Sequence, residues 1–258
     1  MTALPVLFLG LVGLVIGSFL NVVVWRVPRG ESVVSPPSAC PGCNTAIRPR
    51  DNVPVASWLL LKGRCRDCSA PISKRYPLVE AGCAALFVVM ALRFGLDPAL
   101  PAYLYLAAVG LALALIDLDV RRLPDALTLP SYPVAFVLLG GAALFGSDSG
   151  SLLRAVLGAL VVGGLYFALW FAYPKGMGFG DVKLAGVLGL YLGWLGWPEL
   201  LVGVFAAHLL GGTVAVGMLA RGRAGRRTAV PFGPFLVAGA FVAVLVGTPV
   251  AHAWLQTA

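Results

Sequence analysis

The sequence has little charge. Of its 258 residues only 12% are Asp, Glu, Lys or Arg, whereas 59% are hydrophobic. A soluble domain has about a quarter of its residues charged, so this chain has too little polar surface to cover a core in water. We therefore expect an all-α polytopic membrane protein, for which the usual relation between length and domain number does not apply.

Other patterns are missing too. Four of the five cysteines lie in one polar stretch and one in an apolar stretch, which does not resemble a secreted disulfide framework. The net charge of +8 comes from short loops without an aromatic and basic pattern, so we expect no nucleic acid partner. No basic residue precedes the apolar N-terminal stretch, which predicts a retained first span rather than a signal peptide.

Long apolar runs are abundant instead. About 20 such residues cross a hydrocarbon core of about 30 Å, and they must be helical because lipid offers the backbone no hydrogen bonds. We expect about eight transmembrane helices, of which the second, carrying Glu80, and the sixth are short. The expected spans are residues 3–25, 77–92, 98–116, 126–146, 152–173, 184–197, 200–220 and 231–250.

The basic residues give an orientation to these spans. If the N-terminus is outside, all of the 19 Lys and Arg residues except Arg93 and Arg154 lie in inside loops, as the positive-inside rule requires. Both termini are then extracytoplasmic. We expect three parts: a first helix (1–25), a cytoplasmic zinc-binding module (26–76) and a seven-helix membrane domain (77–258). Pairs such as Gly13 and Gly17 favour close helix packing.

Four cysteines point to a metal. Two Cys-x-x-Cys pairs with about 20 residues between them offer four thiolates to one Zn²⁺. A reducing cytoplasm disfavours disulfides here, and a site closed by four protein ligands is structural rather than catalytic. The predicted ligands are Cys40, Cys43, Cys65 and Cys68, and Cys83 is expected to be a core thiol.

Acids near the predicted span ends are the second feature. Asp117, Asp119 and Asp125 follow the third span, and Asp181 lies in a glycine-rich loop before the sixth. Both segments are predicted on the cytoplasmic side, where two carboxyls could share a proton and perform aspartyl-protease chemistry. Nearby glycines would admit irregular backbone and a substrate chain. Solvated acids, ion pairs or helix caps are the alternative for such positions.

At these residues the sequence resembles the prepilin peptidase family (type IV leader peptidases). Matching motifs run from residue 17 to residue 235 in family order. They are GSFLNVVVWRVP (17–28), SACPGC (38–43), IRPRDNVP (47–54), KRYPLVE (74–80), GFGD (178–181) and PFGPF (231–235).

The resemblance implies a membrane-embedded aspartyl endopeptidase. Asp117 and Asp181 would be the catalytic pair, with Asp119 as a minor alternative to Asp117. The substrates would be prepilins or pseudopilins, cut at the cytoplasmic face of the bacterial inner membrane. Members with the cysteine module also methylate the new N-terminus with S-adenosylmethionine, a step with which the glycine matching Gly63 is linked. Supporting roles would fall to Asp119, Asp125, Gly178, Gly180 and Lys183.

Two other readings use the same residues. The aspartates could relay protons in a transporter, or a membrane-anchored zinc module could bind partners without catalysis. Peptide cleavage would contradict the first alternative. Full function after Asp-to-Asn exchange would favour the second. The sequence predicts no binding site for S-adenosylmethionine, since no glycine-rich strand-to-helix motif of the Rossmann kind is present.

Overall fold

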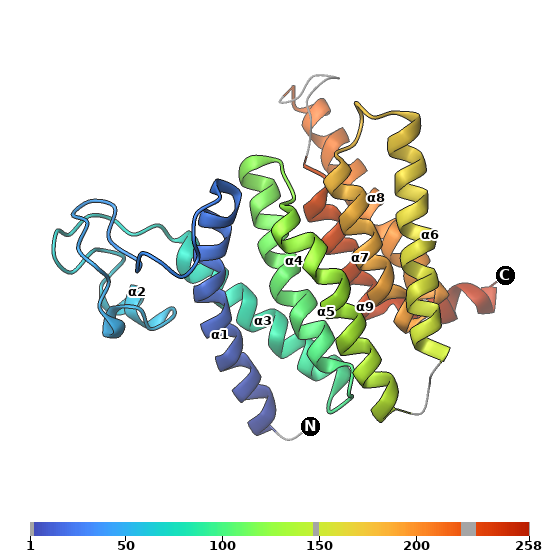
Figure 1. The fold of residues 1–258 in the computed structure, drawn as a ribbon, viewed down its shortest axis with the longest axis horizontal. Helices are drawn as coiled ribbons and strands as arrows, with labels where there is room; N and C mark the ends of the chain where they lie inside the picture. Colours follow the sequence, from blue (N-terminus) through green and yellow to red (C-terminus); the bar gives the residue numbers. More distant parts are fainter. Residues whose placement is uncertain (1–2, 147–149, 223–230, 258) are drawn as a thin grey trace. The chain divides into compact units, whose positions relative to one another are not determined.

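The computed structural model describes residues 3–146, 150–222 and 231–257, with side chains up to residue 247. The described chain is helical and contains only isolated β-bridges. Figure 1 shows the order of the helices along the chain. Their bounds are α1 Ala3–Arg26, α2 Ala56–Leu60, α3 Arg75–Phe94, α4 Leu100–Val120, α5 Asp125–Phe145, α6 Gly150–Ala172, α7 Phe179–Leu195, α8 Trp197–Ala220 and α9 Gly233–Thr257, with 3₁₀ turns η1 Val27–Arg29 and η2 Pro49–Asp51.

The all-α expectation is confirmed, and each of the eight expected spans corresponds to one long helix in the described residues. Six of these helices are long and apolar enough to cross a membrane: α1, α3, α4, α5, α6 and α8. Helix α7 has 17 residues, and the part of α9 with described side chains is a shorter apolar helix. The exact count of eight spans stays a prediction.

The chain divides into two compact units, of which the first ends at Ala112. In this unit α1 packs closely on α3. A Cβ on Gly13 would lie 2.7 Å from Ala84 Cα, and one on Gly17 would lie 2.7 Å from Glu80 Cα. The two glycines therefore let the helix backbones touch, as the small-residue spacing predicts. The polar segment between these helices carries the four cysteines.

The second unit begins at Leu113 and is arranged around α7. This helix contacts α5, α6, α8 and α9, and residues Leu184 to Gly193 are all buried. Glycines again set the spacing, since a Cβ on Gly189 would lie 2.5 Å from Gly158 O in α6. Surrounded on its sides by protein, α7 can be buried although it is short and apolar all round.

Two expected bounds differ from the observed ones in a way that matters for the site. Helix α4 continues past Ile116 to Val120, because no Gly or Pro stops it before Arg121, whose φ is 53°. Helix α7 begins at Phe179 rather than at residue 184. Asp117 and Asp181 therefore lie within helix ends, not in loops. Three basic residues of the expected last inside loop, Arg223, Arg226 and Arg227, lie outside the described residues.

Candidate functional site

The four predicted ligands form one cluster. Their sulfur atoms all lie within 4.8 Å of one another, and Cys40 Sγ and Cys68 Sγ are 3.7 Å apart. A tetrahedral Zn²⁺ with Zn–S bonds of about 2.3 Å would place its sulfurs about 3.8 Å apart. The donor set and its spacing therefore fit a structural zinc ion.

Both Cys-x-x-Cys segments have the same local fold. Cys40 N donates to Thr45 O (3.0 Å) and Cys65 N donates to Ala70 O (2.8 Å). The residue after the second cysteine, Asn44 in one knuckle and Ser69 in the other, has a positive φ of 57° and 59°. These left-handed residues turn the chain back so that both sulfurs of each knuckle point to the same side.

Hydrogen bonds and burial shift the pKa values of two of the thiols. Thr45, whose hydroxyl oxygen lies 3.4 Å from Cys43 Sγ, lowers the pKa of Cys43 to about 7. For Cys68 a backbone hydrogen bond from Ala70 lowers the pKa, but burial and the neighbouring thiols outweigh it and raise the pKa to about 12. Four thiols this close cannot all lose their protons unless a cation compensates the negative charges. A bound divalent metal would supply that positive charge.

Gly63 is held against an indole ring. Its φ is 66°, and a Cβ on it would lie 2.8 Å from Trp58 Cζ2. Trp58 Nε1 donates to Ile72 O (3.1 Å) and Ile72 N donates to Gly63 O (2.7 Å). A side chain at position 63 would therefore displace the half-buried Trp58 and break its contacts within the module.

Glu80 joins this module to the helices of its unit. Its carboxylate is buried and accepts a hydrogen bond from Val55 N (2.6 Å). Val55 has φ 59° and ψ −51°, a costly conformation for a β-branched residue. Asn21 Nδ2 in α1 donates to Tyr76 O (3.3 Å) just inside α3. The acid in the short second span thus anchors the chain between the knuckles.

Asp117 lies in the last turn of α4 and is 5% exposed. Its Oδ2 accepts a hydrogen bond from Gly233 N (2.9 Å), at the first residue of α9. A Cβ on Gly233 would come within 2.8 Å of that oxygen. Position 233 must therefore remain glycine if the backbone is to reach the carboxylate.

Asp181 lies in the first turn of α7, where an acid is favoured by the helix dipole. It is 8% exposed, and its backbone N–H donates to Gly178 O (3.0 Å). The carboxyls of Asp181 and Asp117 are close enough to interact electrostatically. Two buried acids, one from the end of α4 and one from the start of α7, are thus brought together within the second unit.

Leu123 closes the site between these helix ends. It is buried, and its side chain would lie 2.9 Å from a Cβ on Gly180 and 3.2 Å from one on Gly233. The absence of a side chain at Gly180 thus leaves room for Leu123. Neither glycine uses the irregular backbone that it would permit, since Gly178 has φ −72° and ψ 141° and Gly180 is helical.

Of the remaining predicted site residues, Asp119 and Asp125 are exposed and Lys183 is half-buried. Asp119 is exposed on the last turn of α4. Asp125, at the start of α5, forms an ion pair with Lys183 on α7. Tyr132 in α5 also reaches α7, where its hydroxyl donates to Lys183 O (2.8 Å). These contacts tie α5 to the turn of α7 that carries Asp181.

Sequence reasoning did not assign roles to several contact residues. Gly233 lies in the matched PFGPF segment, and that motif was its only signal. Leu123 gave no signal, since it is an ordinary apolar position in the sequence. The contact between Glu80 and Val55 needs a positive φ at a valine, which no sequence pattern predicts.

The helices and the two sites define a class of protein: a multi-pass membrane protein that combines a four-cysteine metal-binding module with a buried pair of aspartates. Family models agree with both parts. Residues 11–94 match the bacterial peptidase A24 N-terminal domain, and residues 104–216 match the type IV leader peptidase family.

Curated relatives extend the match to nearly the whole chain. A prepilin leader peptidase/N-methyltransferase of Aeromonas hydrophila is 39% identical over 98% of this chain and 95% of its own length. The protein of that name from Pseudomonas aeruginosa is 37% identical over 96% of this chain and 92% of its own. No solved structure matches the chain. The chain belongs to the type IV leader peptidase family, which confirms the resemblance.

Proposed function

We propose that this chain is an aspartyl endopeptidase of the inner membrane that removes the short basic leader from type IV prepilins or pseudopilins. We propose further that it methylates the new N-terminus. The observation that carries the proposal is the buried pair of Asp117 and Asp181 in a chain of this family. The curated relatives are named for both activities, as prepilin leader peptidase/N-methyltransferase.

The pair can hydrolyse a peptide bond without a metal-bound water. One carboxylate takes a proton from water, whose oxygen attacks the scissile carbonyl carbon while the other carboxyl donates to the carbonyl oxygen. The C–N bond then breaks as the first carboxyl passes the proton it took from water to the leaving amine, and the second carboxylate regains its proton as the carbonyl re-forms. Gly233 N–H fixes the orientation of Asp117 through Oδ2, and burial of Asp117 beside exposed Asp119 supports the choice of Asp117.

The orientation in the membrane belongs to the same proposal. Asp117 at the end of α4, Asp125 at the start of α5 and Asp181 at the start of α7 share one end of the helices in the second unit. Exposed Arg121, Arg122 and Lys175 belong to the loops there, which supports a cytoplasmic location. Both termini would then be extracytoplasmic. A reporter fused to the C-terminus should give an extracytoplasmic signal.

Methylation is assigned to the chain through its family. Bound Zn²⁺ would hold the two knuckles together and leave no open coordination position for catalysis. The module would then present its surface as one rigid unit around Trp58 and Gly63. No residue is assigned to S-adenosylmethionine.

A cleavage assay distinguishes the proposed peptidase from a transporter. The comparisons do not support the transporter. The purified protein is reconstituted in liposomes with a prepilin, and the products are read by mass spectrometry. We expect a new N-terminus after the basic leader, and added methyl mass when S-adenosylmethionine is present. An intact prepilin with well-folded protein, together with proton flux across the liposomes, would favour the relay instead.

A further inference from the structure

Two leucines of the cysteine module in the first unit are left uncovered. Leu59 and Leu60, at the end of α2, are 61% and 82% exposed. Leu78 on α3 is 69% exposed, but it belongs to a helix that is apolar enough to cross a membrane, so lipid would cover it. The leucines of α2 need a cover as well, since apolar patches at a surface mark protein or membrane interaction sites.

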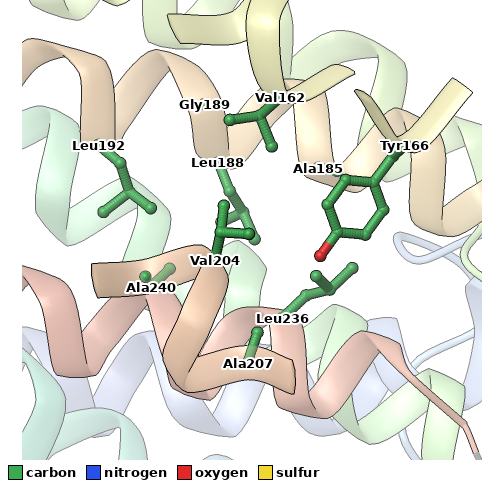
Figure 2. A pocket seen from close by; sticks show the side chains of 11 residues that line it. Val162, Tyr166, Ala185, Leu188, Gly189, Leu192, Val204, Ala207, Leu236 and Ala240 are labelled. Atoms are coloured by element: carbon green, nitrogen blue, oxygen red, sulfur yellow. The ribbon is translucent and has the colours of Figure 1, made fainter. Parts of the chain in front are cut away.

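Leucines inside the second unit show how protein covers such side chains. Figure 2 shows Leu188 from α7 and Leu236 from α9 at the wall of a small cavity, and the surrounding helices bury both of them. Leu59 and Leu60 stay mostly exposed with all described residues of the chain in place. Their cover is therefore not among the described residues.

A hydrogen bond fixes the depth of α2 beside the membrane helices of its unit. Val55, the residue before α2, donates its N–H to the buried carboxylate of Glu80 (2.6 Å). Glu80 follows Arg75, the first residue of α3, by five residues, which places it about 7–8 Å inside that end of the helix. The start of α2 is therefore level with the apolar turns of α3 and not with its charged end.

Helix α1 agrees with this depth. A Cβ on Gly17 would lie 2.7 Å from Glu80 Cα, and Gly17 precedes Arg26, the last residue of α1, by nine residues, or about 13–14 Å. Figure 1 shows α2 beside α1 rather than beyond its end. Basic residues at the ends of spans mark the level of the headgroups, and interfacial helices bury their apolar face about 5–10 Å below it.

The backbone around α2 suits lipid, where every polar backbone group needs a partner within the protein. Before the helix, Val53 N donates to Ser57 Oγ (3.0 Å), and Ser57 N donates to Val53 O (3.0 Å). After it, Leu61 N donates to Ser57 O (2.9 Å). Both ends of α2 are thus closed by hydrogen bonds.

The charges next to α2 complement a lipid surface. Lys62 and Arg64 follow the exposed leucines and are themselves exposed. Long basic side chains can extend to the headgroups while their apolar neighbours stay in the acyl region. They also attract anionic lipids, so this surface fits a bilayer better than it fits water.

We propose that residues 53–61 anchor the cysteine module in the membrane interface, with the Leu59 and Leu60 side chains in the acyl region of an anionic bilayer. The module is then held against the lipid surface by α2, in addition to its covalent links to α1 and α3. This inference does not depend on the proposed function, because it requires only that α1 and α3 are inserted in the membrane.

Fluorescence quenching in liposomes tests the anchor. A fluorescent non-natural amino acid, excited outside the tryptophan band, replaces Leu60 in the full-length protein, and the same probe at Val34 is the control. Val34 is also an exposed apolar residue of the module. It lies in the loop whose carbonyls at Ser32 and Pro36 accept hydrogen bonds from the side chain of Arg26, at the end of α1. The vesicles contain phosphatidylcholine and phosphatidylglycerol, with or without bromine on the acyl chains.

We expect brominated acyl chains to quench the probe at position 60 about twofold, as for an interfacial side chain, and iodide in the water to leave it nearly unchanged. The probe at position 34 should show the opposite pattern. Strong quenching by iodide at position 60, or equal quenching by lipid at both positions, would overturn the inference. Protection from iodide that appears only after a prepilin is added would overturn it too, because the leucines would then bind substrate.

Bound zinc, measured by elemental analysis, shows whether each labelled module is folded. If the probe at position 60 empties the module, the probe at position 59 decides the question by the same criterion. None of these measurements requires cleavage, so a failure of the protein to cut prepilins would count against the proposed function alone.

Discussion

In the cysteine module the ligands of each knuckle are three residues apart, and the bonds that shape it join near neighbours such as Cys65 and Ala70. In the aspartate site, the acids come from α4 and α7, and the hydrogen bond from Gly233 to Asp117 joins residues 116 positions apart. The module is mostly exposed, whereas both acids are buried. One site is thus held by local turns and a metal, the other by helix packing.

Because of this difference, mutations in the two sites should have different consequences. A metal ligand can be removed and the packed helices should persist, because the knuckles contribute little to them. A change of one atom between packed helices, in contrast, moves a carboxyl whose position is fixed by several elements. We expect small changes in the second unit to affect cleavage and changes in the module to affect zinc and methylation.

Among the glycines that border the aspartate pair, the largest effect of a single added methyl should come at Gly233. In Gly233→Ala the Cβ would lie 2.8 Å from Asp117 Oδ2 and 3.2 Å from Leu123 Cδ2. A displacement of about 1 Å can cost about 100-fold in rate, and we expect such a loss in kcat for prepilin cleavage. Gly140→Ala, where nothing lies within 4 Å of the new Cβ, should cleave as the wild type does. Equal rates in the two variants would contradict the placement of Asp117.

Loss of one thiol should empty the module of metal. Cys65→Ser leaves three sulfur ligands, and we expect less than stoichiometric zinc by elemental analysis, with helix content by circular dichroism retained. Cys83→Ser, which changes the buried cysteine of α3, should keep its zinc. Stoichiometric zinc in Cys65→Ser would refute the four-thiolate ligand set.

Gly63 and Gly30 form a matched pair within the module. Both have a positive φ, 66° and 69°, so alanine brings the same backbone strain to each. Only at Gly63 would the Cβ meet Trp58, whereas Gly30 has nothing within 4 Å. We expect Gly63→Ala to lose most methylation while cleavage continues, and Gly30→Ala to retain both. Methylation lost equally in both variants would assign the effect to backbone strain instead.

The smallest effect should come from the ion pair between Asp125 and Lys183. Asp125→Asn removes the exposed partner of half-buried Lys183 at the start of α5, and ion pairs with one exposed member contribute little. We expect cleavage to fall by about two- to fivefold. Lys175→Gln removes an exposed charge from the loop before α7 and serves as the control. A loss as large as that in Gly233→Ala would make Asp125 part of the catalytic machinery.

The sequence predicted the module better than the aspartate site for the same structural reason. Cysteine spacing is local, so the positions of the four cysteines in the sequence were enough to predict the ligand set. Their arrangement in the structure fits the metal. The long helices followed from apolar runs, but their ends did not, because Asp117 and Asp181 are polar residues inside helix ends. Pairing those acids, and adding Gly233 and Leu123 to their surroundings, requires knowing how the helices pack.

The most direct measurement is single-turnover cleavage of a purified prepilin by Asp117→Asn and Asp181→Asn, with Asp119→Asn as the matched control. Asn keeps the shape of each side chain but cannot share or transfer the proton. We predict no detectable cleavage by the first two variants, with thermal unfolding like that of the wild type, and near wild-type cleavage by Asp119→Asn. Cleavage by either folded variant of the pair, or its loss in Asp119→Asn alone, would contradict the assignment.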